Sequence, residues 1–214
     1  MQDLLLSIAR CGEFEAAKAD CNHPCHKIVS IQAQKDYQLP EPWNGNIESA
    51  QILYISSNPS YNPEEIFPNN SWSNEVIEQF FRNRFQNSYY TKTPYWTCIK
   101  KYTSWIIGIP VDDPTLPDRI CITEIVHCKS LRETGVQSCY KHCVQKWLNA
   151  ILREFKGQYI VLLGRFAKEF ENTIRLTGKE PLLMPHINAR KVTDQYRKEL
   201  IALWKKKSML YLVK

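Results

Sequence analysis

The stretch ICITEIVHCKS, residues 120–130, decides the fold of this 214-residue chain. It begins with a mainly apolar run and ends with Glu124, His127 and Cys128. A short apolar run bounded by polar residues is typical of a strand that is buried on both faces of a sheet. Such sheets place functional groups at the carboxyl ends of their strands. Residues 119–126 are therefore predicted to form a buried strand, and the polar residues that end the stretch are candidates for a site.

Similar apolar runs occupy residues 51–56, 159–164 and 181–185. Segments with helical spacing alternate with these runs, at 2–18, 74–86, 95–107, 139–155 and 166–176, and Thr193 can cap a last helix that runs to about residue 206. Alternation of helices with wholly apolar strands predicts a mostly parallel sheet covered on both faces. We expect one α/β domain over residues 1–214, a three-layer sandwich whose central four-stranded sheet is flanked by helices.

Composition narrows the class of protein. There is no apolar run of membrane-spanning length, and the first twenty residues lack a basic region followed by a small-residue cleavage site. We therefore expect a cytoplasmic monomer with no membrane contact. The chain has eight cysteines. In a reducing compartment these are metal or cluster ligands, or buried side chains, more often than disulfides.

Positive charge gathers in the last third of the chain. Residues 141–214 contain 16 Lys and Arg against 6 Asp and Glu, whereas residues 1–140 contain 12 against 16. A basic region on a neutral-to-acidic body indicates a polyanionic partner. The same charge also fits a solvated surface of lysine-rich helices.

Three of the four loops that follow the predicted strands carry chemically useful side chains. These are Asn58 in SNPSYNP, Glu124 with His127 in EIVHCKS, and His186 in PHINARK. Because the carboxyl ends of parallel strands meet at one edge of a sheet, these side chains are expected to lie close together. Read singly, Asn58-Pro59 is a common turn signal, and His186 is an ordinary loop residue.

The order of these motifs resembles the uracil-DNA glycosylase superfamily. ILYISSNPS is similar to that family's G-x-N-P-G motif, ITEIVHCKS to T-N-V-V-x-C-R-P, YIVLLGRFA to its "vLG..A" strand and MPHIN to its H-P-S loop. The similarity covers residues 51 to about 190. It implies a single glycosylase-like domain that binds single- or double-stranded DNA, flips a base out of the stack and cleaves its N-glycosidic bond, with uracil or another altered base as substrate.

The resemblance also implies roles for particular residues. Asn58 occupies the water-positioning place, and His186 matches the histidine that donates toward the departing base. Tyr61 or Phe67 is expected to stack on the base, and Ser60, Arg190 and Lys191 are expected to contact DNA. Residues 61–105 hold 12 of the 25 aromatic residues, which fits base contacts as well as an ordinary core.

Glu124 departs from the family pattern, which has Asn at this position for base recognition. An ionised carboxylate only accepts hydrogen bonds, so it disfavours uracil O4 and favours a base with an exocyclic amino group. A protonated Glu124 can mimic Asn. Alternatively Glu124 is a structural carboxylate that pairs with Lys129 or Arg165.

The cysteines resemble those of the iron–sulfur branch of the superfamily. That branch has a close N-terminal pair, one cysteine after the second motif and one at the start of the next helix. The resemblance implies a [4Fe-4S] cluster on Cys21, Cys25, Cys128 and Cys143. The N-terminal pair has three intervening residues where the family often has two, and Cys139 can replace Cys143.

Other readings of the cysteines and of the function stay open. A set of four cysteines also suits tetrahedral zinc, and all of them can be plain buried side chains, as expected for Cys11, Cys98 and Cys121. The alternative function is a catalytically silent nucleic-acid-binding module that keeps the fold and a metal cluster. A redox sensor that uses the cluster alone is a more distant option.

Overall fold

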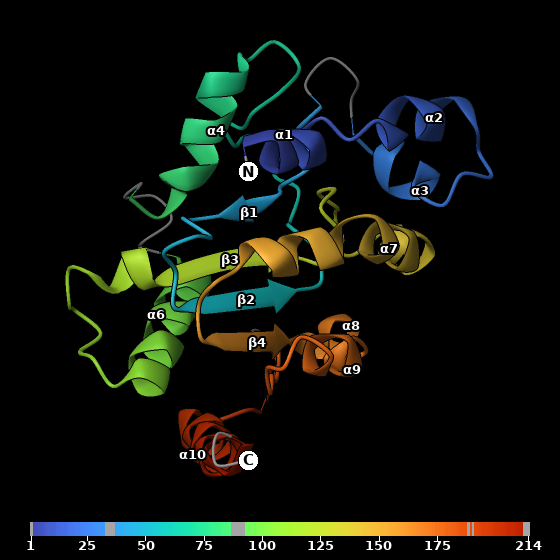
Figure 1. Ribbon diagram of the computed structural model, residues 1–214. Helices are drawn as coiled ribbons and strands as arrows, with labels where there is room; N and C mark the ends of the chain where they lie inside the picture. The colour runs from blue at the N-terminus through green and yellow to red at the C-terminus, as the bar shows by residue number, and fades with distance from the viewer. Residues whose placement is uncertain (1, 33–36, 87–92, 188, 190, 212–214) are drawn as a thin grey trace.

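A computed structural model describes residues 2–32, 37–86, 93–187, 189 and 191–211, with a five-stranded sheet at the centre (Figure 1). The strands are β1 (Trp43–Asn44), β2 (Ile52–Ser56), β3 (Ile120–Glu124), β4 (Tyr159–Leu163) and β5 (Leu182–Met184). Their order is β1-β3-β2-β4-β5. The pairs β3–β2, β2–β4 and β4–β5 are parallel, and β1 runs antiparallel to β3.

The four predicted parallel strands are confirmed, and β1 is an addition. β1 has only two residues, too few to produce a pattern in the sequence. Within the described part of the chain, the α-helices are α1 (Gln2–Ala9), α2 (Glu13–Ala19), α3 (His26–Val29), α4 (Asn74–Arg82), α6 (Pro94–Ile107), α7 (Val136–Glu154), α8 (Gly164–Lys168), α9 (Glu171–Arg175) and α10 (Asp194–Tyr211). The predicted helices at 2–18 and 166–176 are each divided into two, and the last helix is longer than expected.

Helices cover both faces of the sheet, which confirms the three-layer arrangement. α7 crosses the face seen in Figure 1, and α6 lies behind the strands. Leu53 and Ile55 of β2 pack in the core on the α7 side, together with residues of α1 and α4. Ile52 and Tyr54 pack in the second core, with α6 and α10. Because alternate strand residues face opposite layers, every position of the central strand is apolar or buried.

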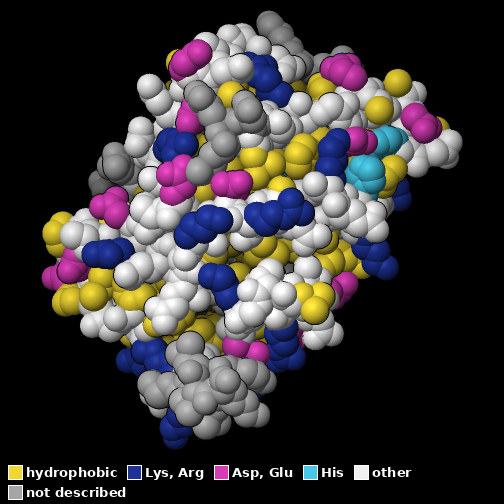
Figure 2. Space-filling view, viewed as in Figure 1, with side chains coloured by type: hydrophobic (Ala, Val, Ile, Leu, Met, Phe, Trp, Pro, Cys, Tyr) yellow, Lys and Arg dark blue, Asp and Glu magenta, His cyan; other side chains and the backbone are white. Residues whose placement is uncertain are grey.

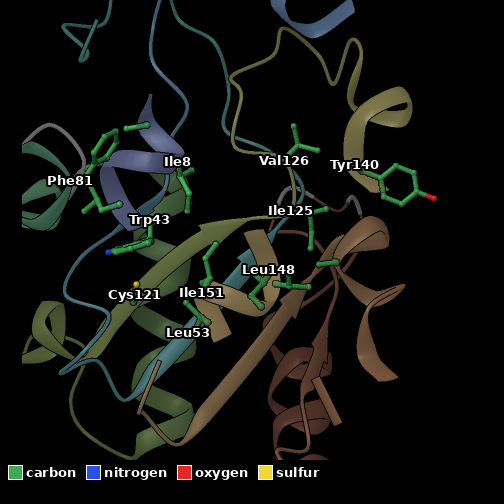
Figure 3. Close-up of a cluster of buried hydrophobic side chains, with 14 of the residues drawn as sticks. Ile8, Trp43, Leu53, Phe81, Cys121, Ile125, Val126, Tyr140, Leu148 and Ile151 are labelled. Atoms are coloured by element: carbon green, nitrogen blue, oxygen red, sulfur yellow. The ribbon is translucent and has the colours of Figure 1, made fainter. Parts of the chain in front are cut away.

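Figure 3 shows the first core. Leu148 and Ile151 of α7 approach Leu53 and Cys121 of the sheet, and all four side chains are buried. In the second core the Tyr54 hydroxyl bonds the Thr103 hydroxyl of α6 at 2.9 Å, which satisfies a buried polar group. No helix in the described ranges is both long enough and apolar enough to cross a membrane.

Gly135 fixes the N-terminal helices against α7. It has a φ of +82° immediately before α7, and a Cβ at this position would lie 2.6 Å from the backbone nitrogen of Ile28 in α3. Only glycine fits such a close approach in a left-handed conformation. This contact matters for function because α3 and α7 both border the cavity described below.

Replacing Gly135 with Ala should lower the free energy of unfolding by about 2 kcal/mol or more, since it adds backbone strain and a steric overlap. Gly12→Ala is the matched control, because Gly12 has a φ of −63° and open space around its Cα. Urea titrations of both variants measure the effect. Equal stability of the two variants would contradict the proposed close packing.

Candidate functional site

The loops after β2 and β3 continue the pairing of the two strands beyond the sheet. The backbone N–H groups of Ile125 and Val126 donate to the carbonyls of Ser56 and Ser57, both at 2.9 Å. Ser130 then donates to Pro59 at 3.0 Å, and Tyr61 donates back to Ser130 at 3.0 Å. The two predicted functional loops are thus held side by side, as their place in the sheet implied.

Asn58 is oriented by these loops. Its amide nitrogen donates to the Ser130 hydroxyl at 2.7 Å and to the Pro59 carbonyl at 2.9 Å. Within the described part of the chain no hydrogen bond reaches the amide oxygen, so this atom can accept one from a water or a ligand. An acceptor held in a fixed direction is the group needed to orient a nucleophilic water.

Asn58 and Glu124 border one open hollow. Ser60 and Lys129 also line it, and so do Tyr95 and Trp96 at the start of α6. Thr93 caps that helix by accepting from the Trp96 backbone N–H at 3.4 Å. The hollow therefore combines an amide, a carboxyl group and aromatic rings, the kinds of groups that bind a base.

Glu124 is a buried carboxyl group at the end of β3. Its side chain is 7% exposed, and its Oε2 atom has no hydrogen-bond partner among the described residues. Burial raises the pKa of Glu124 well above its usual value, and the nearby Glu41 raises it further, while a hydrogen bond with Ser56 opposes the shift. Burial therefore favours the protonated form of Glu124, which can both donate and accept a hydrogen bond.

Beside Glu124 lies a buried ion network. The Glu65 carboxylate receives Lys129 Nζ at 2.6 Å and Arg84 at 3.0 Å, and Arg84 lies 3.6 Å from Glu41. The Phe67 ring faces both cations, with Lys129 Nζ 3.5 Å from its centroid. Lys129 therefore pairs with Glu65 and not with Glu124, and the second suggested partner, Arg165, lies over the Phe166 ring.

The aromatic residues of the hollow differ from those expected. Phe67 is buried in the first core under the cations, and Tyr61 is half-buried outside the lining of the hollow. Tyr95 and Trp96 occupy the wall instead. Burial raises the pKa of Tyr95 well above 10, and the charges of Glu124 and Glu41 add to the shift, so its hydroxyl stays a neutral donor. Nothing in the sequence distinguishes Tyr95 and Trp96 from the core residues of a helix.

His186 lies in a neighbouring hollow, away from Asn58 and Glu124. Its hollow is bordered by Ser57 and Glu133, and a Cβ on Gly164 would lie 3.4 Å from the His186 side chain. Burial lowers the pKa of His186, although the Glu133 charge opposes the shift, so the imidazole is neutral at pH 7. Ser57 borders this hollow and its sequence neighbour Asn58 borders the first, so both hollows lie close to the end of β2.

Five cysteines line a separate cavity: Cys11, Cys25, Cys128, Cys139 and Cys143. They come from the α1–α2 turn, the start of α3, the loop after β3 and the helix α7. The Cys139 thiol donates to the Val136 carbonyl at 3.7 Å, and the Tyr37 hydroxyl donates to the Cys128 sulfur at 3.8 Å. Burial raises the pKa of both Cys128 and Cys143.

Cys21 is the predicted ligand that the structure does not bring to this cavity. It is exposed, in a turn that precedes Pro24, whereas Cys11 lies at the cavity wall. The turn directs the chain so that Cys25 alone of the close pair reaches the interior. Cys121 is buried in β3 and Cys98 is half-buried in α6, both outside the cavity, as expected for packing residues.

The distances between the cysteine sulfurs limit the kind of metal centre that they could hold. Tetrahedral zinc with four thiolates needs sulfurs ~3.8 Å apart. In the described ranges, no three cysteine sulfurs lie within 4.8 Å of one another. A cluster that offers a different iron to each thiolate suits a wider arrangement. The described cysteine sulfurs are therefore not placed as the four ligands of a tetrahedral zinc ion.

A polar group closes one side of the cavity. The Glu13 carboxylate contacts His23 Nε2 at 3.1 Å, His142 Nε2 at 3.3 Å, and the Lys146 ammonium group. Figure 2 shows histidine side chains beside acidic and basic ones at the upper right, in the region of α2 and α3. His23 Nδ1 accepts from the Cys25 backbone N–H at 3.1 Å, so Nε2 carries a proton and donates to Glu13. The contacts of Glu13 with His142 and Lys146 therefore hold α2 against α7.

The residues expected to contact DNA are only partly placed. Ser60 lines the hollow and forms a bridge with Ser130. Lys191 is exposed with a φ of 64°. Arg190 lies outside the described residues.

Comparison with known proteins gives no family for this chain. No protein-family model matches the sequence, and none of the curated proteins is significantly similar to it.

The raised pKa of Glu124 predicts a pH-dependent effect of Glu124→Gln. An unfolded Glu loses its proton near pH ~4.3, whereas the folded protein keeps it to a higher pH, so between the two pKa values this group lowers stability by up to about 1.4 kcal/mol per pH unit. Gln cannot titrate. The variant should therefore gain stability relative to the wild type as pH rises from 5 to 7, by about 1–3 kcal/mol in urea titrations.

Glu48→Gln is the control for this titration, because Glu48 is an exposed glutamate on the surface. Its stability should follow the wild type at every pH. Parallel curves for Glu124→Gln and the wild type would show that Glu124 is ionised in the folded protein.

Proposed function

We propose that this protein is a DNA glycosylase-like enzyme that binds a flipped base at the carboxyl edge of β2 and β3. The observation that carries the proposal is the meeting of Asn58 and Glu124 in one hollow beside Tyr95 and Trp96. The resemblance of the four sequence motifs to the uracil-DNA glycosylase superfamily supports the same reaction. DNA is the polyanionic partner that the positive last third of the chain favours.

The chemistry follows from the groups present. A flipped base is held by stacking and by hydrogen bonds to its edge. The Asn58 amide oxygen then orients a water toward the sugar carbon as the glycosidic bond breaks. His186 is neutral and can donate a hydrogen bond toward the departing base if the DNA bridges the two adjoining hollows.

A basic surface is available for the DNA backbone. Figure 2 shows lysine and arginine side chains across the middle of one face, over α7 and the neighbouring strands. Lys191 is exposed on the loop between β5 and α10, after His186. Such side chains position the nucleic acid through its phosphates and add affinity that weakens with salt.

A panel of labelled oligonucleotides, each with one altered base, tests the reaction. The wild type should release at least one base, and Asn58→Ala should be slower by about 10²–10⁴-fold because the water loses its acceptor. Asn172→Ala, at an exposed position in α9, should match the wild type.

Release of no base by the wild type, with DNA binding retained, would contradict catalysis and favour the silent binding module. The position of His186 in the neighbouring hollow is the observation that favours this second candidate. Loss of binding as well would contradict both.

We further propose that Cys11, Cys25, Cys128 and Cys143 hold a [4Fe-4S] cluster. All four line the cavity, and their thiols are the donors such a cluster requires. When bound, the cluster would crosslink the N-terminal segment, the loop after β3 and α7. Cys139 is the alternative ligand, since it also lines the cavity.

Iron analysis of anaerobically purified variants tests this set. The wild type should contain about four irons per chain, and Cys11→Ser and Cys128→Ser should lose most of this iron. Cys21→Ser should retain it, as should Cys98→Ser in α6. If Cys11→Ser keeps its iron and Cys21→Ser loses it, the ligands would be the set implied by the family resemblance. One zinc per chain in place of iron would contradict the cluster.

A further inference from the structure

Three side chains other than cysteines converge on one point at the edge of the cysteine cavity. The Nε2 atoms of His23 and His142 lie 3.1 Å and 3.3 Å from the same oxygen, Oε2 of Glu13. Among the residues that the structure describes, this is the one group of three His, Cys, Asp or Glu side chains whose ligand atoms all lie within 4.8 Å of one another. The cavity cysteines do not meet this condition, so the group is a candidate metal site distinct from them.

The separations within the group match those of a tetrahedral zinc site. Zinc binds histidine nitrogen at about 2.0–2.1 Å and carboxylate oxygen at about 2.0–2.2 Å, so neighbouring ligand atoms lie about 3.3–3.5 Å apart. The two nitrogen-to-oxygen distances are already close to this value. Two histidines and one glutamate, with a fourth position left to water, are also a set of ligands that zinc uses in proteins.

Three separate segments hold the ligands in place. Glu13 begins α2, His23 lies in the turn before α3, and His142 lies on α7. Lys146, one turn further along α7, donates to Oε1 of Glu13 and so leaves Oε2 facing the histidines. This hydrogen bond is the largest cause that lowers the pKa of Glu13 to about 2, although burial opposes the shift. The carboxylate is therefore ionised, as a metal ligand must be, and is oriented by an outer partner.

The group is open to solvent. The side chains of His23, Glu13 and His142 are 13%, 27% and 37% exposed, and Figure 2 shows histidine at the surface in this region. An ion can therefore enter from solvent, and a water can fill the fourth position. Entry displaces the proton that His23 Nε2 holds toward Glu13. If that proton moves to Nδ1, the bond from the Cys25 N–H is lost, a cost of one hydrogen bond against three new zinc–ligand bonds.

We propose that Glu13, His23 and His142 form a zinc site, with water as the fourth ligand. The site is separate from the proposed cysteine ligands, and it does not rest on the proposed function. Bound zinc would join α2, the turn before α3 and α7 through one ion. Since an ion that binds only the folded chain shifts the folding equilibrium, zinc would also stabilise the protein.

Zinc binding by the anaerobically purified full chain tests this site. Calorimetric titration with zinc chloride should show one zinc bound per chain. The zinc-edge X-ray absorption spectrum of that complex should show nitrogen and oxygen neighbours at about 2.0–2.1 Å, without the sulfur neighbours at about 2.3 Å that a cysteine site gives. Iron in the cysteine cavity does not interfere, because the spectrum is read at the zinc edge. Sulfur neighbours, or no zinc binding, would overturn the proposal.

Substitutions of histidine identify the ligands. His23→Gln and His142→Gln each remove an imidazole but keep a side-chain N–H that can donate to Glu13. Each should weaken zinc binding by more than about 100-fold, since loss of an outer partner alone costs about 10–100-fold. His26→Gln is the matched control, because His26 bonds to the Ala17 carbonyl at 2.7 Å and lies outside the group.

The control should bind zinc as tightly as the wild type. Circular dichroism establishes that all three variants are folded before their affinities are compared. Wild-type affinity in folded His23→Gln or His142→Gln would overturn the assignment of that ligand, and equal weakening in His26→Gln would show that the effect is not specific to the site and would overturn the proposal.

Discussion

The parallel pairing of β2 with β3 is the constraint on which both candidate sites depend. Ser56 pairs with Glu124 at the end of the two strands, and the backbone hydrogen bonds continue through Ile125 and Val126. The pairing resumes between Pro59 and Ser130. Since the register is set by the apolar cores on both faces of the sheet, a slip of one residue would reverse every side chain of β3. Asn58 and Glu124 would then no longer share a hollow.

The segment from residue 124 to residue 130 joins the two sites. Glu124 and Lys129 line the hollow, whereas His127 and Cys128 line the cysteine cavity. His127 also links this segment to Glu41: its Nδ1 bonds the Glu41 carbonyl at 2.8 Å, and its own carbonyl accepts from the Glu41 N–H at 2.8 Å. Burial lowers the pKa of His127 to about 4, so it is neutral at pH 7 and acts as a structural link. A cluster bound at Cys128 would therefore restrain the segment that carries Glu124 and Lys129 into the hollow.

The sequence predicts the sheet well because its central strands are mainly apolar and do not alternate with polar residues, as in ILYIS and ICITE. It predicts the meeting of Asn58 and Glu124 because both follow parallel strands. It does not predict the partners that come from elsewhere. Asn44 belongs to the two-residue strand β1, and Glu41 belongs to the segment before it. The positions of both residues depend on the pairing of β1 with β3.

The cysteine cavity shows the same limit. Cys128 and Cys143, which the family resemblance implied, line the cavity, but Cys11 lies at the cavity wall in place of Cys21 because of the turn before Pro24. Short turns of this kind depend on tertiary contacts, and spacing in the sequence does not reveal them. The aromatic wall also escaped prediction, since Tyr95 and Trp96 look like the core residues of any amphipathic helix. Their exposure to the hollow arises only from the way α6 begins beside β3.

A ligand site at the carboxyl edge of β2 and β3 is tested most directly by a crystal structure of the anaerobically purified protein with a single strand that contains uracil or another altered base. The structure is expected to show one base turned into the hollow, with Glu124 within hydrogen-bond reach of its edge and with Asn58 facing the sugar. A strand that lies along the basic surface with every base outside the hollow, or a base held by other residues, would contradict the account.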